Sequence, residues 1–441
     1  MLRLKTLQRS QDILRSLLLF LKISLFLRQI NGKIKIPYLI KALYSKKPVW
    51  LFIPKLVFND DIKAISSKYL DVNFVSLKRG PLVALTKCII GDNLSIYNYI
   101  SNSEKIINRK KRLYKIYWLF IFLLKRVINL QGIISGAYYY VEQRELAKAA
   151  LDNGIEFVVL HKECITSPIE ILVRNYIFRE RTGPFTGSVL LTYNQDELNN
   201  LKDNSVVPSK CITRVTGAPR IDELFKLNNF SERSIDVSFF WFGKYTYLPE
   251  HFFKGEDMWG KLKDLKLYNS IRWDWSNLQT SYLKAIIKYA NINPNLNIVL
   301  KSKVGFEMSD HDINEIKDLK NIRLVKQGTA QSLLKNSKVV IAFNSTVIFE
   351  ALAAHCYVGT LSFEEADKSK ESGRLGTLDL NRSIEELKSV EEMYKFCDRF
   401  SSVQEENKLT IDGEKLLDQY LGNKDGLSSI RLRTVLQGLL K

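Results

Sequence analysis

"VVIAFNSTVIFEAL" occupies residues 339–352 and decides the fold of the second half of the chain. An apolar run ends at Phe343, three polar residues follow, and a stretch with the apolar spacing of a helix begins directly after them. A buried strand that leads straight into a helix is the building unit of a parallel sheet covered on both faces. The polar residues Asn344, Ser345 and Thr346 fall at the turn between strand and helix, where open α/β sheets bind their ligands.

The same alternation of apolar strands and helices runs outward from this stretch through most of the chain. It starts at residue 49, is interrupted by the polar segment 226–234, and starts again at residue 236. We therefore predict an α/β fold with two doubly wound Rossmann-like domains facing a cleft, an N-terminal basic helix and C-terminal helices. The predicted parts are a basic amphipathic segment at 1–48, an acceptor-side domain at 49–228, a donor-binding domain at 235–382, and helices at 383–441 that pack back across the domains.

Charge is concentrated near the start of the chain. The net charge is +19, and residues 1–59 hold twelve Lys and Arg against a single acid, Asp12. Such an excess attracts a protein to an anionic partner. Residues 11–30 are expected to form an amphipathic helix, which lies either on a membrane surface or against its own domain. The run "IYWLFIFLL" at 116–124 is expected to be a buried helix, with a basic flank suited to lipid headgroups.

Other sequence features narrow the protein class. No stretch reaches the roughly 20 uninterrupted apolar residues of a membrane span, and no signal-peptide cleavage site is recognisable. The five cysteines are scattered and form no CxxC pair, which argues against a disulfide framework or zinc site and favours a reducing cytosol. Composition is that of a globular protein.

The turn at 344–346 has the features of a nucleotide site. Backbone N–H groups at the start of a helix, together with the hydroxyls of Ser345 and Thr346, can receive a phosphate group. Glu350 lies four residues after Thr346 on the same helical face, so its carboxylate can accept hydrogen bonds from both hydroxyls of a ribose or sugar diol. The alternative is that Ser345 or Thr346 only caps a core helix in which Glu350 is salt-bridged.

Three stretches resemble glycosyltransferases of the GT-B fold. "VVIAFNSTVIFEALAAHCYVGTLSF" resembles their donor-site strand–helix–strand, especially in bacterial enzymes of capsule, lipopolysaccharide and teichoic-acid synthesis. "RVTGAPRIDELF" at 214–225 is similar to the end of their first domain, and "YVEQRELAKAALDNGIEFVVLHKE" to their acceptor-domain segment. Over residues 49–441, the predicted order of strands and helices also resembles that of these enzymes. Where many members carry a His after the strand "NIVLKS", this chain has Lys301 and Lys303.

The resemblance implies roles for individual residues. It places the donor on Asn344, Ser345, Thr346 and Glu350, with Lys301, Lys303 and Arg220 as further donor-binding residues. It makes His161 a general base or acceptor-binding residue, for which an unperturbed pKa near ~6.5 is suitable, with Glu163 and Glu142 as rivals. These residues also have structural alternatives. His161 would be a core residue, the two lysines would lie in solvent, and Arg220 would form a structural pair with Asp222.

We expect no metal and no cofactor. Asp310-His311-Asp312 reads as a DxD triplet, but it opens a helix, where acids stabilise the helix dipole. The predicted protein is a cytoplasmic, peripheral glycosyltransferase on the inner leaflet of the cytoplasmic membrane. It would move a sugar or a polyol phosphate from a nucleotide-activated donor to a cell-surface glycan or lipid-linked acceptor. The alternatives are a sugar-nucleotide 2-epimerase of similar fold, an inactive GT-B scaffold, and a nucleic-acid-binding protein, for which no sequence signature is present.

Overall fold

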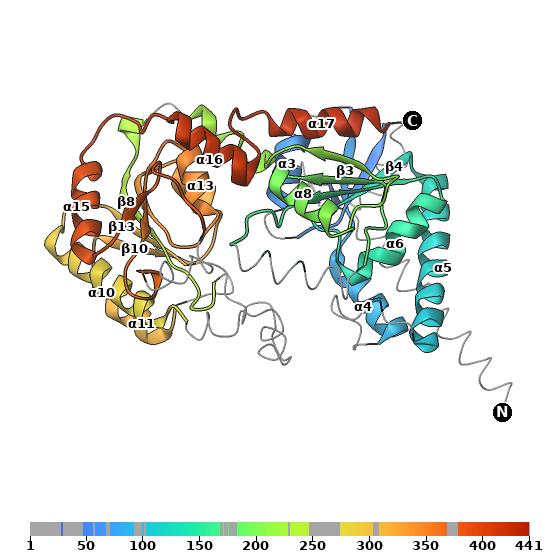
Figure 1. The fold of residues 1–441 in the computed structure, drawn as a ribbon, viewed down its shortest axis with the longest axis horizontal. Helices are drawn as coiled ribbons and strands as arrows, with labels where there is room; N and C mark the ends of the chain where they lie inside the picture. The colour runs from blue at the N-terminus through green and yellow to red at the C-terminus, as the bar shows by residue number, and fades with distance from the viewer. Residues whose placement is uncertain are drawn as a thin grey trace. The chain divides into compact units, whose positions relative to one another are not determined.

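The computed structural model divides the chain into two compact units (Figure 1). Unit 1 comprises residues 1–164, 175–220 and 427–441, and unit 2 comprises residues 165–174 and 221–426. The structure describes residues 47–55, 58–67, 71–91, 99–100, 103–167, 171, 175, 183–227, 230–246, 274–302, 308–367 and 378–440, together with the backbone of 28–29. The predicted helix at 11–30 and Lys303 therefore lie outside the described residues, except for residues 28–29.

Unit 1 contains a seven-stranded sheet in the spatial order β1-β3-β2-β4-β5-β6-β7. All neighbouring strands are parallel except β1, which is antiparallel to β3. The strands are β1 (Arg28–Gln29), β2 (Val49–Phe52), β3 (Asn73–Ser76), β4 (Leu130–Ser135), β5 (Glu156–His161), β6 (Val189–Thr192) and β7 (Ile212–Val215). The order of the six parallel strands reverses between β2 and β4, so the topological switch point of this sheet lies between them.

Six helices of unit 1 surround this sheet among the described residues. They are α3 (Phe58–Ser66), α4 (Arg79–Ile90), α5 (Glu104–Val127), α6 (Val141–Asp152), α8 (Gln195–Asp203) and, from the end of the chain, α17 (Ser428–Gly438). Central strands are tightly packed: a Cβ atom on Gly132 of β4 would lie only 2.1 Å from the Trp50 ring of β2. Glycine at this position is therefore required for the two central strands to lie beside each other.

Unit 2 contains a six-stranded parallel sheet in the order β10-β9-β8-β11-β12-β13. Numbered along the unit this is 3-2-1-4-5-6, the order of dinucleotide-binding Rossmann domains, with the switch point between β8 and β11. The strands are β8 (Ile235–Phe240), β9 (Ile298–Lys301), β10 (Ile322–Val325), β11 (Ser337–Ile341), β12 (Tyr357–Leu361) and β13 (Glu385–Leu387). The helices are α10 (Ser276–Ile292), α11 (Asp310–Ile316), α12 (Ala330–Leu334), α13 (Val347–Ala353), α15 (Val390–Ser401) and α16 (Ile411–Leu421).

The predicted fold class of two doubly wound Rossmann-like domains is confirmed by these two sheets. Three local expectations need correction. Arg28 and Gln29, at the end of the predicted N-terminal helix, form the edge strand β1, because their backbone pairs with β3. The start of the predicted C-terminal helical region forms β13, which pairs with β12. Helix α4 was not expected, although its Pro81 lies in the first helical turn, where a missing N–H costs nothing.

The segment 226–234 begins at the last residue of a short 3-10 turn, η3 (Leu224–Lys226), and contains a second one, η4 (Phe230–Glu232). Directly after them, the buried Arg233 guanidinium donates to the carbonyl oxygens of Ser337, at 2.8 Å, and Ala354, at 2.6 Å. These bonds fix the chain to β11 and to the end of α13 just before β8 begins. The boundary between the two units falls earlier, after Arg220.

Candidate active site

In unit 2, the predicted donor residues Asn344, Ser345 and Thr346 lie at the carboxyl edge of β11, next to the switch point. Asn344 is buried and has a backbone φ of +43°, a left-handed conformation that few residues other than glycine adopt. Its side-chain oxygen accepts a hydrogen bond from the backbone N–H of Leu378 at 3.2 Å. Unusual backbone conformations of this kind concentrate at ligand sites, because the surrounding structure must hold them in place.

Aromatic side chains pack against Phe343, the residue that precedes this turn. The ring of Phe343 packs against Phe242, with 4.9 Å between ring centroids, and edge-on against Trp275 at 4.8 Å. Trp275 is fully buried, and its indole nitrogen donates to the carbonyl oxygen of Thr246 at 2.8 Å. The loops that follow β8 and β11 are therefore held together by a rigid aromatic cluster. Trp275 is part of this packing.

Three predicted donor residues start or occupy α13. The hydroxyl oxygen of Ser345 accepts from the backbone N–H of Val347 at 3.4 Å. Thr346 is the N-cap of α13, but its side chain makes no capping hydrogen bond. Glu350 is 5% exposed, on a helix whose residues are all buried. Thr346 and Glu350 thus lie four residues apart on the helix that follows the buried strand, as the sequence predicted.

The remaining predicted donor residues are placed differently. Lys301 ends β9 and is buried, and its amine donates to the carbonyl oxygens of Ser302, at 2.8 Å, and Lys326, at 3.4 Å. Arg220 belongs to unit 1, where its guanidinium donates to the hydroxyl of Tyr193 at 2.9 Å and lies 3.6 Å from the Asp61 carboxylate. Asp61 is thus an ionic partner of Arg220 within unit 1. Asp222 accepts a hydrogen bond from the side-chain amide of Asn423 at 2.8 Å.

In unit 1, charged side chains gather at the carboxyl edge of the sheet, beside the switch point between β2 and β4. Lys55 follows β2, and its amine hydrogen-bonds to the hydroxyl of Tyr140, which precedes α6. Arg79, at the start of α4, places its guanidinium 4.3 Å from the Tyr140 ring centroid and forms an ion pair with Glu142. Glu142 is one of the predicted catalytic residues, and it is buried.

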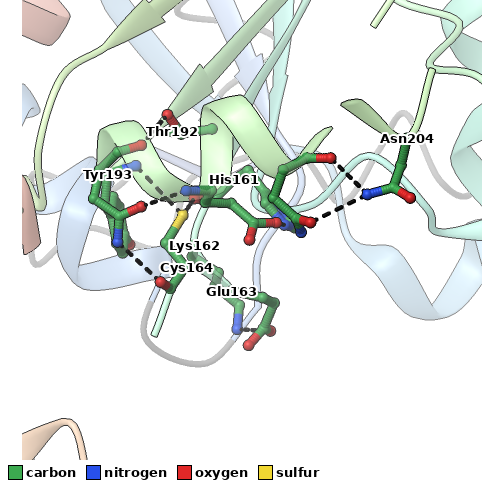
Figure 2. A network of polar contacts seen from close by, with 10 residues as sticks. His161, Lys162, Glu163, Cys164, Thr192, Tyr193 and Asn204 are labelled. Carbon is green, nitrogen blue, oxygen red and sulfur yellow. Dashed lines mark hydrogen bonds and ion pairs between the residues drawn. The ribbon is translucent and has the colours of Figure 1, made fainter. Parts of the chain in front are cut away.

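The loop after β5 adds two more charges to this group (Figure 2). Lys162 and Glu163 form an ion pair, and the amine of Lys55 lies 3.9 Å from the same carboxylate of Glu163. The side chain of Glu163 is 36% exposed. We call Lys55, Arg79, Lys162, Glu142 and Glu163, with Tyr140, the Lys55 cluster. It carries three cationic and two anionic side chains.

His161 lies directly before this cluster in the chain but is enclosed. It is the last residue of β5, is 0% exposed, and has its Nε2 atom 3.2 Å from Oε1 of Glu197 on α8. Its carbonyl oxygen accepts a hydrogen bond from the thiol of Cys164 at 2.8 Å. The ring of His161 would therefore reach an acceptor only after a movement that exposes it. Otherwise it would act on the acceptor through a neighbouring residue.

The charged side chains of the cluster shift one another's pKa values. Burial raises the pKa of Glu163, but Lys162 and Lys55 outweigh this effect and hold the pKa at about 2. Burial lowers the pKa of the Lys55 amine, and the neighbouring charge of Lys162 lowers it further, to about 8. Perturbed pKa values of this size, next to specific charged partners, are typical of functional sites.

Sequence reasoning found the two carboxylates of the cluster but missed Lys55, Arg79, Lys162 and Tyr140. A signal was present, because Lys55 and Lys162 both follow buried apolar strands closely. Parallel strands present their carboxyl ends at one edge of a sheet, so residues that follow neighbouring strands lie close together. Which strands are neighbours was not known from the sequence.

The DxD triplet opens α11, as expected. The side chain of Asp312 and that of Ser309 form a reciprocal capping box with the helix backbone. His311, Asp312 and Glu315 nevertheless bring three potential metal-ligand atoms within 4.8 Å of one another, the one such group in the described part of the chain. Capping by Asp312 already accounts for one of these carboxylates.

No protein-family model and no curated protein matches the chain. Similar solved structures include a UDP-GlcNAc 2-epimerase from Methanocaldococcus jannaschii, with 13% identity and a TM-score of 0.46 over 89% of this chain and 99% of that one. A UDP-GlcNAc 2-epimerase from Neisseria meningitidis bound to UDP-GlcNAc has 13% identity and a TM-score of 0.45 over 89% of this chain and all of the other. The wall teichoic acid polymerase TagF has 10% identity and a TM-score of 0.46, over 90% and 89%.

Proposed function

We propose that this protein is a glycosyltransferase-type enzyme that takes a sugar or a polyol phosphate from a nucleotide-activated donor. The observation that carries the proposal is the position of Asn344, Ser345 and Thr346. They lie at the carboxyl end of β11, one of the two strands that bound the switch point of a 3-2-1-4-5-6 sheet. Nucleotides bind at this position in doubly wound sheets.

On the donor side, the proposal assigns three roles to five of the predicted residues. The hydroxyls of Ser345 and Thr346 donate to the phosphates, and the carboxylate of Glu350 accepts from the ribose hydroxyls. Lys301 and Lys303 supply positive charge near the leaving phosphate. Lys301 would do so through its field, since its amine already donates to two carbonyl oxygens.

On the acceptor side, the Lys55 cluster is proposed to receive the acceptor hydroxyl. Of the predicted bases, Glu163 is more exposed than His161 or Glu142. A carboxylate with a pKa of about 2 is a weak base, whereas an amine with a pKa near 8 is well matched to neutral pH. We therefore infer that the proton passes to Lys55. The hydroxyl oxygen then bonds to the transferred group, and the nucleotide leaves with the electron pair of the bond that breaks.

The donor proposal is tested by nucleotide-dependent stabilisation. Among CMP, CDP, UDP and GDP, at least one should raise the melting temperature of the purified protein. Ser345→Ala and Glu350→Gln should each abolish the rise without unfolding the chain. Ser332→Ala is the matched control, because Ser332 lies in α12 of the same unit and its hydroxyl donates to the backbone carbonyl of Thr329 at 2.7 Å. If both site variants bind nucleotide like the parent, the donor site is elsewhere.

The acceptor proposal is tested by the pH dependence of transfer. If neutral Lys55 takes the proton, the rate should rise with pH to a plateau with a midpoint near 8. Lys55→Gln should remove this dependence and most of the activity, while nucleotide binding is kept. A rate that does not change across neutral pH and is lost in Glu163→Gln would make Glu163 the base.

Product analysis separates the proposal from its alternatives. Transfer releases free nucleotide, whereas a 2-epimerase returns the sugar nucleotide intact with its C2 centre inverted. We expect transfer to survive EDTA. Activity that EDTA abolishes and Mn²⁺ restores would instead implicate His311, Asp312 and Glu315. The class of acceptor, a cell-surface glycan or a lipid-linked saccharide at the cytoplasmic leaflet, is proposed from the sequence resemblance and from the basic N-terminal half.

A further inference from the structure

Helix α5 packs one face against its own unit. Its buried residues recur every three or four positions, as in a helix with one core-facing stripe: Leu113, Tyr117, Phe120, Ile121 and Leu124. The hydroxyl of Tyr117 donates to the backbone carbonyl of Glu142 at 3.1 Å, which ties this face to α6. Figure 1 shows α5 beside α6, at the outside of unit 1. Of residues 116–124, which were expected to be buried, four are buried and five are partly or fully exposed.

The opposite face of α5 leaves large apolar side chains in solvent. Leu119, Leu123 and Val127 are 38%, 48% and 45% exposed, and they follow one another at four-residue spacing. Side chains at this spacing form one continuous ridge on a helix. Four of the ten large apolar residues exposed in the described part of the chain belong to α5, the fourth being Ile107. This concentration on one helix distinguishes α5 from the scattered apolar residues found on any protein surface.

Cations flank the apolar ridge at both ends. Helix α5 holds eight Lys and Arg and one acid, Glu104, a net charge of +7 in 24 residues. The ridge itself continues N-terminally into the exposed Lys111 and Lys115. At its other end, the guanidinium of Arg126 lies 4.0 Å from the ring centroid of Phe122, which stacks on Trp118. Aliphatic, aromatic and basic side chains are thus combined along one helix.

We propose that this face of α5 docks unit 1 on the surface of an anionic lipid bilayer. The apolar ridge would enter the boundary between headgroups and acyl chains, and the flanking cations would lie among lipid phosphates. No helix in the described residues is long and apolar enough to cross a membrane, so docking would be interfacial. The proposal does not depend on the proposed activity.

Charge and composition together select this partner. A nucleic acid would use the cations, but it would gain little from Leu119, Leu123 and Val127. A second copy of the chain would bring one helix of charge +7 against another, and like charges on facing surfaces disfavour that contact. A bilayer with anionic lipid uses both features, because it offers phosphates and an apolar layer within a few ångströms of each other.

The test measures binding of the full-length protein to vesicles of phosphatidylcholine with and without phosphatidylglycerol. The parent should co-sediment with the anionic vesicles and be released by high salt. Leu119→Gln/Leu123→Gln should weaken binding roughly tenfold, because two half-exposed leucines no longer insert. Lys111→Gln/Lys115→Gln should weaken it by more than tenfold, at about fivefold for each cation.

Helix α10 provides matched controls, since Lys284, Lys288 and Ile292 are also exposed at four-residue spacing. Lys284→Gln/Lys288→Gln and Ile292→Gln, at a residue 60% exposed, should bind vesicles like the parent. Circular dichroism and nucleotide binding should be unchanged in every variant. The proposal is wrong if the α5 and α10 variants lose binding equally, or if the leucine variant binds anionic vesicles like the parent. Loss in the lysine variant alone, together with salt-sensitive RNA binding by the parent, would indicate a nucleic acid instead.

Discussion

At the scale of single residues, Lys55 has an amine whose charge is disfavoured by burial and by the neighbouring cation Lys162. With a pKa of about 8, about half of its amines are neutral at pH 8, roughly 100-fold more than for an ordinary lysine. A limiting amount of an acylating reagent should therefore modify Lys55 well before the exposed Lys284, as measured by peptide mass spectrometry. Lys162→Gln should slow the modification, because it removes the second cause of the shift. Equal rates at Lys55 and Lys284 would contradict this prediction.

Arg220 raises a different question at the same scale, because it was predicted to bind the donor. Its guanidinium and Asp61 are both buried, and the backbone N–H of Arg220 also donates to Asp61 at 3.1 Å. Arg220→Met would leave a buried carboxylate without its cation, which costs about 3–5 kcal/mol of the free energy of unfolding. Urea denaturation should show this loss. Arg382→Met, at an exposed ion pair with Asp412, should change stability little.

Stability and binding together decide the role of Arg220. Loss of stability with nucleotide binding retained in the surviving folded fraction would make it a structural residue of unit 1. If Arg220→Met is instead as stable as the parent and no longer binds nucleotide, the donor-binding role holds.

At the scale of elements, the turn from β11 to α13 depends on the left-handed conformation of Asn344. Alanine pays about 1–2 kcal/mol in this region, and glycine does not. Both substitutions lose the hydrogen bond from the backbone N–H of Leu378. We therefore expect Asn344→Ala to be less stable than Asn344→Gly by about 1 kcal/mol in urea denaturation. Equal stability of the two variants would mean that the turn relaxes to another conformation.

At the scale of the whole molecule, the end of the chain belongs to the unit that contains its beginning. Helix α17 packs on α3, and its Leu432 and Leu436 are almost completely buried. Leu432→Ala should cost about 2–5 kcal/mol, because it leaves a cavity in unit 1. Hydrogen exchange should then quicken in β2 and β3 of unit 1, while β9 and β11 of unit 2 keep their protection.

The control for this prediction lies on the same helix. Ile430 is 45% exposed, so Ile430→Ala should leave exchange in both units nearly unchanged. An equal increase of exchange in β9 and β11 after Leu432→Ala would show that the two units unfold as one.

The sequence by itself determined the fold class and the position of the polar turn at residues 344–346. Apolar periodicity reports whether a segment is buried on one face or two, and this sufficed for most long strands and helices, helix α4 being an exception. It could not show β1 or β13, which have two and three residues and are strands only because β3 and β12 lie beside them. A backbone ladder between distant segments leaves no periodic signal in either segment.

Only the tertiary structure decided which side chains meet. Lys55, Arg79 and Lys162 come from three separate elements, and they converge because β4 lies between β2 and β5 in the sheet. The same holds for His161. The sequence predicted its place at the end of a strand, but its enclosure depends on Glu197 from α8. The sequence pattern fixes where each strand ends, whereas strand order, set by long-range packing, decides which ends are neighbours and therefore what chemistry they can share.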